Sequence, residues 1–143
     1  MASRDYLIRQ IEEMGIFLAI LLRRILKMKE ENQQGQIESV VKESLIQELK
    51  LDIDQIIILE NEEFLSLVKE VFTKEDQLGK LADILLILGQ EIEHSFTLTK
   101  AAYLRKSLFL FTHLQETSPD FSYERKIKIE KLQELMERTG LND

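Results

Sequence analysis

Hydrophobic positions recur every three or four residues along most of the chain, which is the spacing of one face of an α-helix. Short polar breaks separate these stretches, among them "NQQGQ" around Gly35 and "TSPDFS", which holds the only proline. Because proline and glycine are scarce, few positions force a helix to end. The pattern therefore predicts an all-α protein of about seven helices. The expected helices cover residues 3–31, 36–49, 53–59, 62–72, 73–92, 96–117 and 122–138.

Two of these helices depend on local features. The run "IIIL" at 56–59 also fits a buried strand, but no second strand-like run is present to pair with it, so a short helix is expected. Thr73, with Asp76 three residues later, is typical of a capping box that starts the fifth helix.

The first expected helix holds the most apolar part of the chain, "MGIFLAILLRRIL" at 14–26. Phe17 and Ile20 extend its apolar surface beyond one stripe, so the helix should be covered on two sides. Two interpretations stay open: the helix runs through the middle of the monomer, or it covers its own core with one face and a second copy with the other. Arg23 and Arg24 are expected at the surface, where they complement the helix dipole. The main stripe comprises Leu7, Ile8, Ile11, Met14, Leu18, Leu21, Leu22, Ile25 and Met28.

This apolar run is too short for a membrane. Seven consecutive apolar residues, 16–22, come before the two arginines, whereas a spanning helix needs roughly 20. Acidic residues ahead of the run do not fit a secretory signal peptide. We therefore expect no membrane span.

Length and composition favour one folded domain over residues 1–143. A chain of 143 residues that is 44% hydrophobic and 31% charged is typical of a globular protein and not of a disordered one. The absence of cysteine excludes disulfides and thiolate metal sites and fits a reducing compartment, so a cytoplasmic location is expected.

Charge is distributed unevenly along the chain. The net charge of −7 makes nucleic acid an unexpected partner, because an acidic surface repels phosphates. Residues 29–76 hold 13 acidic and 5 basic side chains. The segment "YERKIKIEKL" instead gathers Arg125, Lys126 and Lys128 beside Tyr123. This basic cluster is either a solvated face or a site for the acidic region of another copy.

Each candidate metal-binding or catalytic motif lacks a residue that its chemistry requires. A calcium loop starting at Asp52 would have Ile57 where a glycine is needed. Glu91 and His94 form a single Glu-x-x-His pair, whereas di-iron bundles use two. The Ser-x-x-Lys pairs at 39–42 and 66–69 lack the companion motifs of acylating enzymes. The sequence thus predicts no catalytic, cofactor-binding or metal-binding residue.

The stretches "DYLIRQIEEMGIFLAILLRRIL" and "FSYERKIKIEKLQEL" resemble the two ends of a family of small bacterial proteins of unknown function, which are all-helical and tetratricopeptide-like. The resemblance implies antiparallel helix pairs in a tetratricopeptide-like arrangement and a bacterial cytosolic setting. It implies no functional residue, and no strict 34-residue repeat is present. Positions in these ends that could either pack or bind are Tyr6, Arg9, Tyr123, Glu124 and Arg125.

Together these observations predict a non-enzymatic protein-interaction or adaptor module that associates with itself as a homodimer. An enzyme is not expected, because no acid, base and nucleophile cluster along the chain. The alternative is a helical regulator that holds an apolar small molecule between its helices. The expected interaction surface comprises Phe17, Ile20, Arg23, Arg24, Tyr123, Arg125, Lys126 and Lys128.

Overall fold

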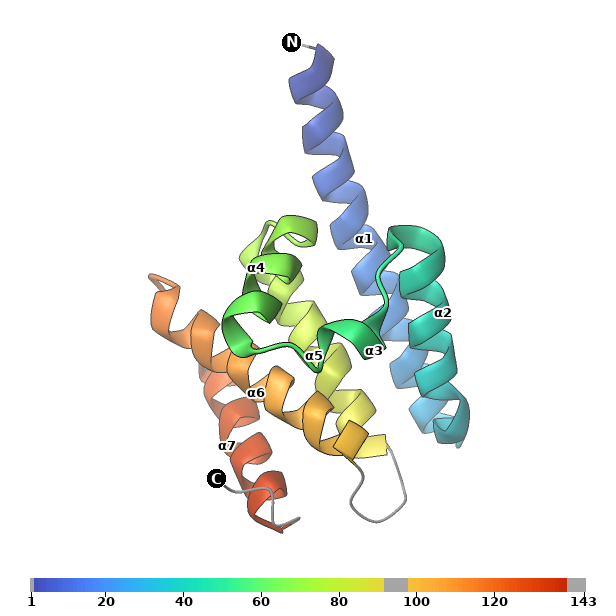
Figure 1. Ribbon diagram of the computed structural model, residues 1–143, viewed down its shortest axis with the longest axis vertical. Helices are drawn as coiled ribbons and strands as arrows, with labels where there is room; N and C mark the ends of the chain where they lie inside the picture. The colour runs from blue at the N-terminus through green and yellow to red at the C-terminus, as the bar shows by residue number, and fades with distance from the viewer. Residues whose placement is uncertain (1, 92–97, 139–143) are drawn as a thin grey trace.

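A computed structural model of the protein describes residues 2–91 and 98–138. Within these ranges the chain forms seven α-helices and one short 3-10 helix, η1, and no strand, so the all-α prediction is confirmed. The segment around "IIIL" contains a one-turn helix. The helices are α1 (Ala2–Glu30), α2 (Ile37–Leu49), α3 (Ile53–Ile56), α4 (Asn61–Val71), α5 (Glu75–Glu91), α6 (Leu98–Thr117) and α7 (Tyr123–Arg138), with η1 at Gln34–Gln36 (Figure 1).

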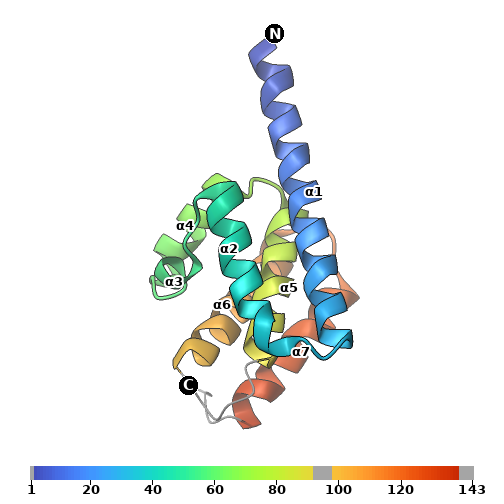
Figure 2. The ribbon, with the colours of Figure 1, turned by 90° about the vertical axis from the view of Figure 1, so that its right-hand side faces the viewer.

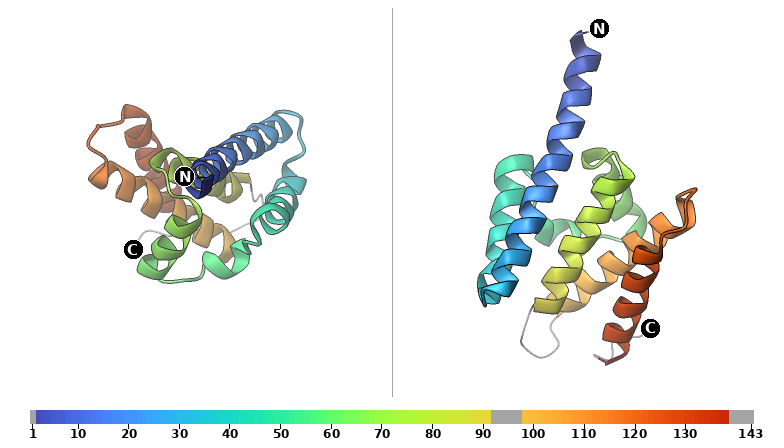
Figure 3. Two further views of the ribbon diagram at one scale, coloured as in Figure 1. Left: turned by 90° about the horizontal axis from the view of Figure 1, so that it is seen from above. Right: turned by 180° about the vertical axis from the view of Figure 1, so that it is seen from behind.

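The long helices form a sequence of antiparallel neighbours (Figure 1). α1 and α2 make a hairpin, α6 folds back along α5, and α7 folds back along α6. α1 and α5 lie side by side in the same direction, as the view from behind shows (Figure 3). The short α3 and α4 lie on the side of the molecule away from α7 (Figure 2). Buried apolar side chains from all seven described helices meet in one hydrophobic core.

α5 is the central helix of this core. Every residue from Ile84 to Gly89 is buried, as are Leu78, Leu81 and Ala82. Only a helix with neighbours on several sides can bury consecutive residues in this way. α5 meets that condition because it packs against α1, α2 and α6.

The interpretation that the first helix runs through the middle of the monomer is therefore wrong. α1 lies at the edge of the molecule and buries one stripe, formed by Leu18, Leu21, Ile25 and Met28. Ile16 and Ile20 are 59% and 60% exposed. The register of the stripe is confirmed, and the second apolar face is exposed in the single chain, which leaves its covering by a second copy a prediction.

Helix ends follow local chemistry. α7 begins where expected, because the Ser122 hydroxyl accepts a hydrogen bond of 3.2 Å from the backbone N–H of Arg125, as an N-cap does. α5 begins two residues later than the Thr73 capping box predicted, with the Leu78 N–H bonded to the carbonyl of Lys74. α2 ends at Leu49, and the next residue, Lys50, caps it in a left-handed conformation with φ of 54°.

Close contact between α5 and α6 depends on small side chains. A Cβ atom at Gly89 would lie 2.5 Å from Cδ2 of Leu104, so the two helices meet where a side chain is missing. One polar contact spans the same pair of helices, because the buried Ser107 hydroxyl donates to the carbonyl of Ala82 at 2.8 Å. The missing Cβ and this hydrogen bond fix how α6 lies on α5.

We predict that Gly89→Ala lowers the free energy of unfolding by about 1–3 kcal/mol, because the added methyl group forces Leu104 to move in a packed core. Gly35→Ala is the matched control, since a Cβ there has no neighbour within 4 Å. The control should change the free energy by no more than about 0.5 kcal/mol. Urea denaturation of both variants measures the difference, and equal effects would contradict the packing argument.

Candidate interaction site

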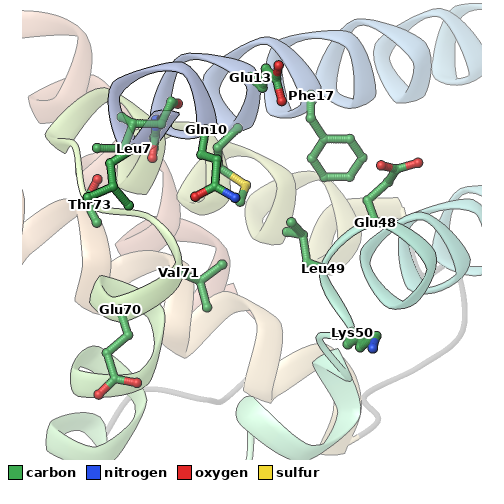
Figure 4. A pocket seen from close by; sticks show the side chains of 13 residues that line it. Leu7, Gln10, Glu13, Phe17, Glu48, Leu49, Lys50, Glu70, Val71 and Thr73 are labelled. Carbon is green, nitrogen blue, oxygen red and sulfur yellow. Dashed lines mark hydrogen bonds between the residues drawn. The ribbon is translucent and has the colours of Figure 1, made fainter. Parts of the chain in front are cut away.

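A groove of about 640 Å³ opens between the N-terminal half of α1, the end of α2 and the end of α4 (Figure 4). Its walls combine apolar side chains with a charged edge. Phe17 lies opposite Leu49 and Glu48, and Leu7 lies near Thr73 at the other end (Figure 4). The apolar lining residues are Leu7, Ile11, Met14, Phe17, Leu49 and Val71, and the charged ones are Glu13, Glu48, Glu70 and Lys50.

Residues 3–10 of α1, here called the arm, extend beyond the body of the protein (Figures 1 and 2). Every side chain of the arm is exposed. The exposed fractions of Tyr6, Leu7 and Ile8 are 58%, 56% and 46%. The arm therefore presents apolar surface that the described part of its own chain does not cover.

The arm continues the core-facing stripe of α1. Leu7 and Ile11 stand seven residues before Met14 and Leu18, so they lie on the same side of the helix as the buried residues. Farther along α1, α2 and α5 cover that side. Near the arm, α2 has already ended at Leu49 and α5 begins only at Glu75, which leaves the stripe facing the groove.

Gln77 is a polar side chain at the base of this groove. It is 3% exposed, and its amide nitrogen donates to the carbonyl of Ile11 at 2.8 Å, which ties α5 to α1. Its amide oxygen is buried and accepts no hydrogen bond from the residues that the structure describes. A buried carbonyl without a partner costs about 1–3 kcal/mol, so it calls for an explanation. Gln77 was not predicted from the sequence, although a glutamine directly before the stripe of Leu78 and Leu81 is a detectable signal.

Unpaired charges surround the groove. Glu13, Glu48 and Glu70 line it, and none of them forms an ion pair with a described residue. The arginines of the arm, Arg4 and Arg9, are likewise without an ion-pair partner among residues 2–91 and 98–138. The three carboxylates were not singled out from the sequence, because their positions become neighbours only when α1, α2 and α4 meet.

The structure separates the residues predicted for the interaction surface. Phe17 is half-buried and lines the groove. Ile20, Arg23 and Arg24 are exposed on α1 outside the groove. The expected basic cluster of the last helix lies on α7, which contributes no residue to the groove.

On α7 the predicted cluster divides further. Tyr123 is 74% exposed and makes an edge-on contact with Phe121, with ring centroids 5.1 Å apart. Lys126 is exposed, and a guanidinium nitrogen of Arg125 donates to the carbonyl of Asp120 at 3.0 Å. The spacing of apolar residues in the helix predicted at 122–138 places Ile127 in its buried stripe, but Ile127 is 62% exposed, so that assignment is wrong.

Lys128 is not a free surface cation. Its ammonium group lies 2.7 Å from Asp83 on α5 and 3.2 Å from Glu124, and 5.5 Å from the centre of the Phe111 ring. Burial lowers the pKa of Lys128, but the two carboxylates outweigh it and raise that pKa above 10.5. Burial raises the pKa of Asp83, because one ammonium group only partly offsets desolvation and the nearby charge of Glu124. The pair therefore holds α7 onto α5.

The candidate chemical groups have structural partners. Burial lowers the pKa of Lys42, but Asp54 at 3.1 Å and Glu38 at 3.6 Å outweigh it and raise that pKa, so the ammonium group keeps its proton and is a poor base. Asp52 caps α3. Glu91 pairs with Lys29 at 3.2 Å, and the metal hypothesis for His94 lies outside the described residues.

The described residues contain neither a metal-binding cluster nor a membrane-spanning helix. No group of three or more histidine, cysteine or acidic side chains is placed there to hold a metal ion. None of the helices at 2–91 and 98–138 has both the length and the apolar character to cross a membrane.

We predict that Lys128→Met lowers the free energy of unfolding by about 1 kcal/mol near pH 8, because it leaves Asp83 without its counter-ion. Since the folded pKa of Lys128 is raised, its contribution is present below pH 10.5 and is lost as the pH rises through the folded value. The difference in the free energy of unfolding between Lys128→Met and the wild type should therefore be smaller at pH 11 than at pH 8. Urea denaturation at both pH values tests this, with the exposed Lys126→Met as a control that should have little effect.

Comparison of the chain with protein-family models, with curated proteins and with solved structures found no match. The groove and the arm are therefore interpreted from their geometry and chemistry alone.

Proposed function

We propose that the protein is a non-enzymatic interaction module that associates with a second copy of itself through the arm of α1. The observation that carries the proposal is the exposure of Tyr6, Leu7 and Ile8 on a helix that leaves the body of the protein. An apolar surface of this kind marks an interaction site in a soluble helical protein.

Helix energetics support the same proposal. The arm is the outer end of a 29-residue helix and bears no nucleation cost, but propagation contributes little stability, because most helical stability in proteins comes from packing of an amphipathic face. Contacts with another surface would supply the missing stabilisation, as they do for most amphipathic helices in proteins. A second copy of the chain can provide such a surface, because it is present wherever the protein is.

A groove of about 640 Å³ also falls within the usual range for small-molecule sites, which favours the alternative of an apolar ligand. Such a ligand would fill the space beside Phe17 and Leu49 but would leave the outer arm exposed. We therefore rank self-association first.

The tetratricopeptide-like arrangement of the helices stays a proposal. The pairs α1/α2 and α5/α6, whose first helices lie side by side, are compatible with a tetratricopeptide-like arrangement. A bacterial source and a cytoplasmic location remain predictions from the sequence.

The test is the molar mass of the protein by light scattering at low and high salt. We expect a dimer at both, because an interface formed mainly by apolar side chains resists screening. Leu7→Glu should shift the equilibrium to monomer, since a charge on the arm opposes burial.

Leu26→Glu is the matched control, because Leu26 is also exposed on α1 but lies far from the arm. It should leave the dimer unchanged. A monomeric wild type at high protein concentration would refute self-association, and a melting temperature that rises with apolar ligands would then favour the small-molecule alternative.

A further inference from the structure

We propose that the two copies exchange arms, so that the arm of one copy lies in the groove of the other. This inference rests on the proposed self-association and specifies where each arm binds. The occupant is residues 3–10 of a second copy, and the receiving surface is the groove between α1, α2 and α4.

The exchange itself determines the direction in which the arm enters. In a two-fold pair the two α1 helices can run parallel or antiparallel. A parallel pair would place arm beside arm, so only the antiparallel pair brings each arm to the groove of the other copy. The groove extends along α1 from Leu7 to Phe17, about 15 Å at 1.5 Å per residue, and the arm spans about 12 Å. An arm that runs in the opposite direction therefore fits, with its Leu7 close to Phe17 and Leu49 of the other copy.

The charges agree with this direction. In the antiparallel arrangement Arg4 of the entering arm comes next to Glu48, which lies beside Phe17 at the inner end of the groove (Figure 4). Both groups lack an ion-pair partner among the described residues of their own chain. The positive end of the α1 dipole also approaches Glu48, which adds to the attraction.

Gln77 supplies an independent observation. Its buried amide oxygen at the base of the groove accepts no hydrogen bond within the described chain. The oxygen is buried, so a donor reaches it only when the Gln77 side chain turns into the groove; an occupant with polar side chains can then pair with it, whereas a purely apolar ligand cannot. The arm offers Gln10, an amide donor that stands three residues after Leu7 and hence on the same side of the helix.

Single cysteines test the exchange in the chain of residues 1–143, which contains no cysteine of its own. Leu7→Cys and Leu49→Cys are prepared separately, mixed and oxidised mildly. We expect a disulfide-linked dimer in the mixture and none from either variant alone. In the exchanged dimer the two Leu7 positions are about 15 Å apart, too far for a disulfide, which needs Cα atoms within about 7 Å.

Gln47→Cys mixed with Leu7→Cys is the matched control. Gln47 is exposed on α2, two residues before Leu49 and hence on a different side of the helix, and does not line the groove. Equal cross-linking to positions 47 and 49 would overturn the inference. So would a covalent dimer from Leu7→Cys alone, which would mean that the arms pack tip to tip.

Failure of the inference can be distinguished from failure of the proposed function. If the wild type is a dimer by light scattering but position 7 does not cross-link to position 49, the exchange is wrong and self-association stands. If the wild type is a monomer, both are wrong.

A charge exchange gives a second test. The exchanged dimer contains two Arg4–Glu48 pairs, each worth about two- to fivefold in Kd as an exposed ion pair. Arg4→Glu and Glu48→Arg should therefore each weaken the dimer by about 4- to 25-fold in Kd, and mixing the two variants should restore it. Arg9→Glu is the control, because Arg9 lies two residues from both Leu7 and Ile11 and so faces away from the groove. A loss of affinity that mixing does not restore would contradict the pairing.

Discussion

The packing of α6 onto α5 is the constraint on which the other helices depend. α1 and α2 pack against α5, and α4 and α7 pack against α6, so each is positioned by this central pair. The pair can approach closely because Gly89 has no side chain where Leu104 lies. The hydrogen bond from Ser107 to the carbonyl of Ala82 fixes the same contact with a group that cannot be moved without leaving a buried polar atom unpaired.

This arrangement explains why α1 has both a buried and an exposed half. α5 covers α1 only over its own length, and it begins at Glu75, well below the arm. Gln77 marks the upper limit of that contact, since it bonds the carbonyl of Ile11 while its oxygen faces no donor in the described chain. The groove and the projecting arm are therefore two consequences of one feature, a long helix packed against a shorter one.

Buried polar side chains connect the outer helices to this centre. The Tyr103 hydroxyl on α6 donates to Glu38 on α2 at 2.7 Å, and burial together with that carboxylate raises the pKa of Tyr103. The ammonium group of Lys106 donates to Asn61 on α4 at 2.8 Å and lies 5.3 Å from the centre of the Phe64 ring. Each contact satisfies a group that would otherwise be costly to bury, and each links helices more than 40 residues apart in sequence.

The sequence determined the helices, because helical periodicity and end signals are local. The stripes of α1, α2 and α5 and the Ser122 start of α7 were read from neighbouring residues. The number of helices that cover each stripe, by contrast, is not determined by neighbouring residues. The run at 16–22 looked central, yet α5 occupies that position, since coverage depends on the number of neighbouring helices.

The same reason explains the candidate site. The sequence identified Phe17, but Glu48, Glu70 and Gln77 are distant in the chain and come together only through packing. Lys128 was predicted as part of a basic surface cluster, and its pairing with Asp83 was not foreseen because Asp83 lies 45 residues earlier, on a helix whose position the sequence did not show. Helix formation depends on residues a few positions apart, whereas burial and charge pairing depend on which helices meet, and only the tertiary structure decided that.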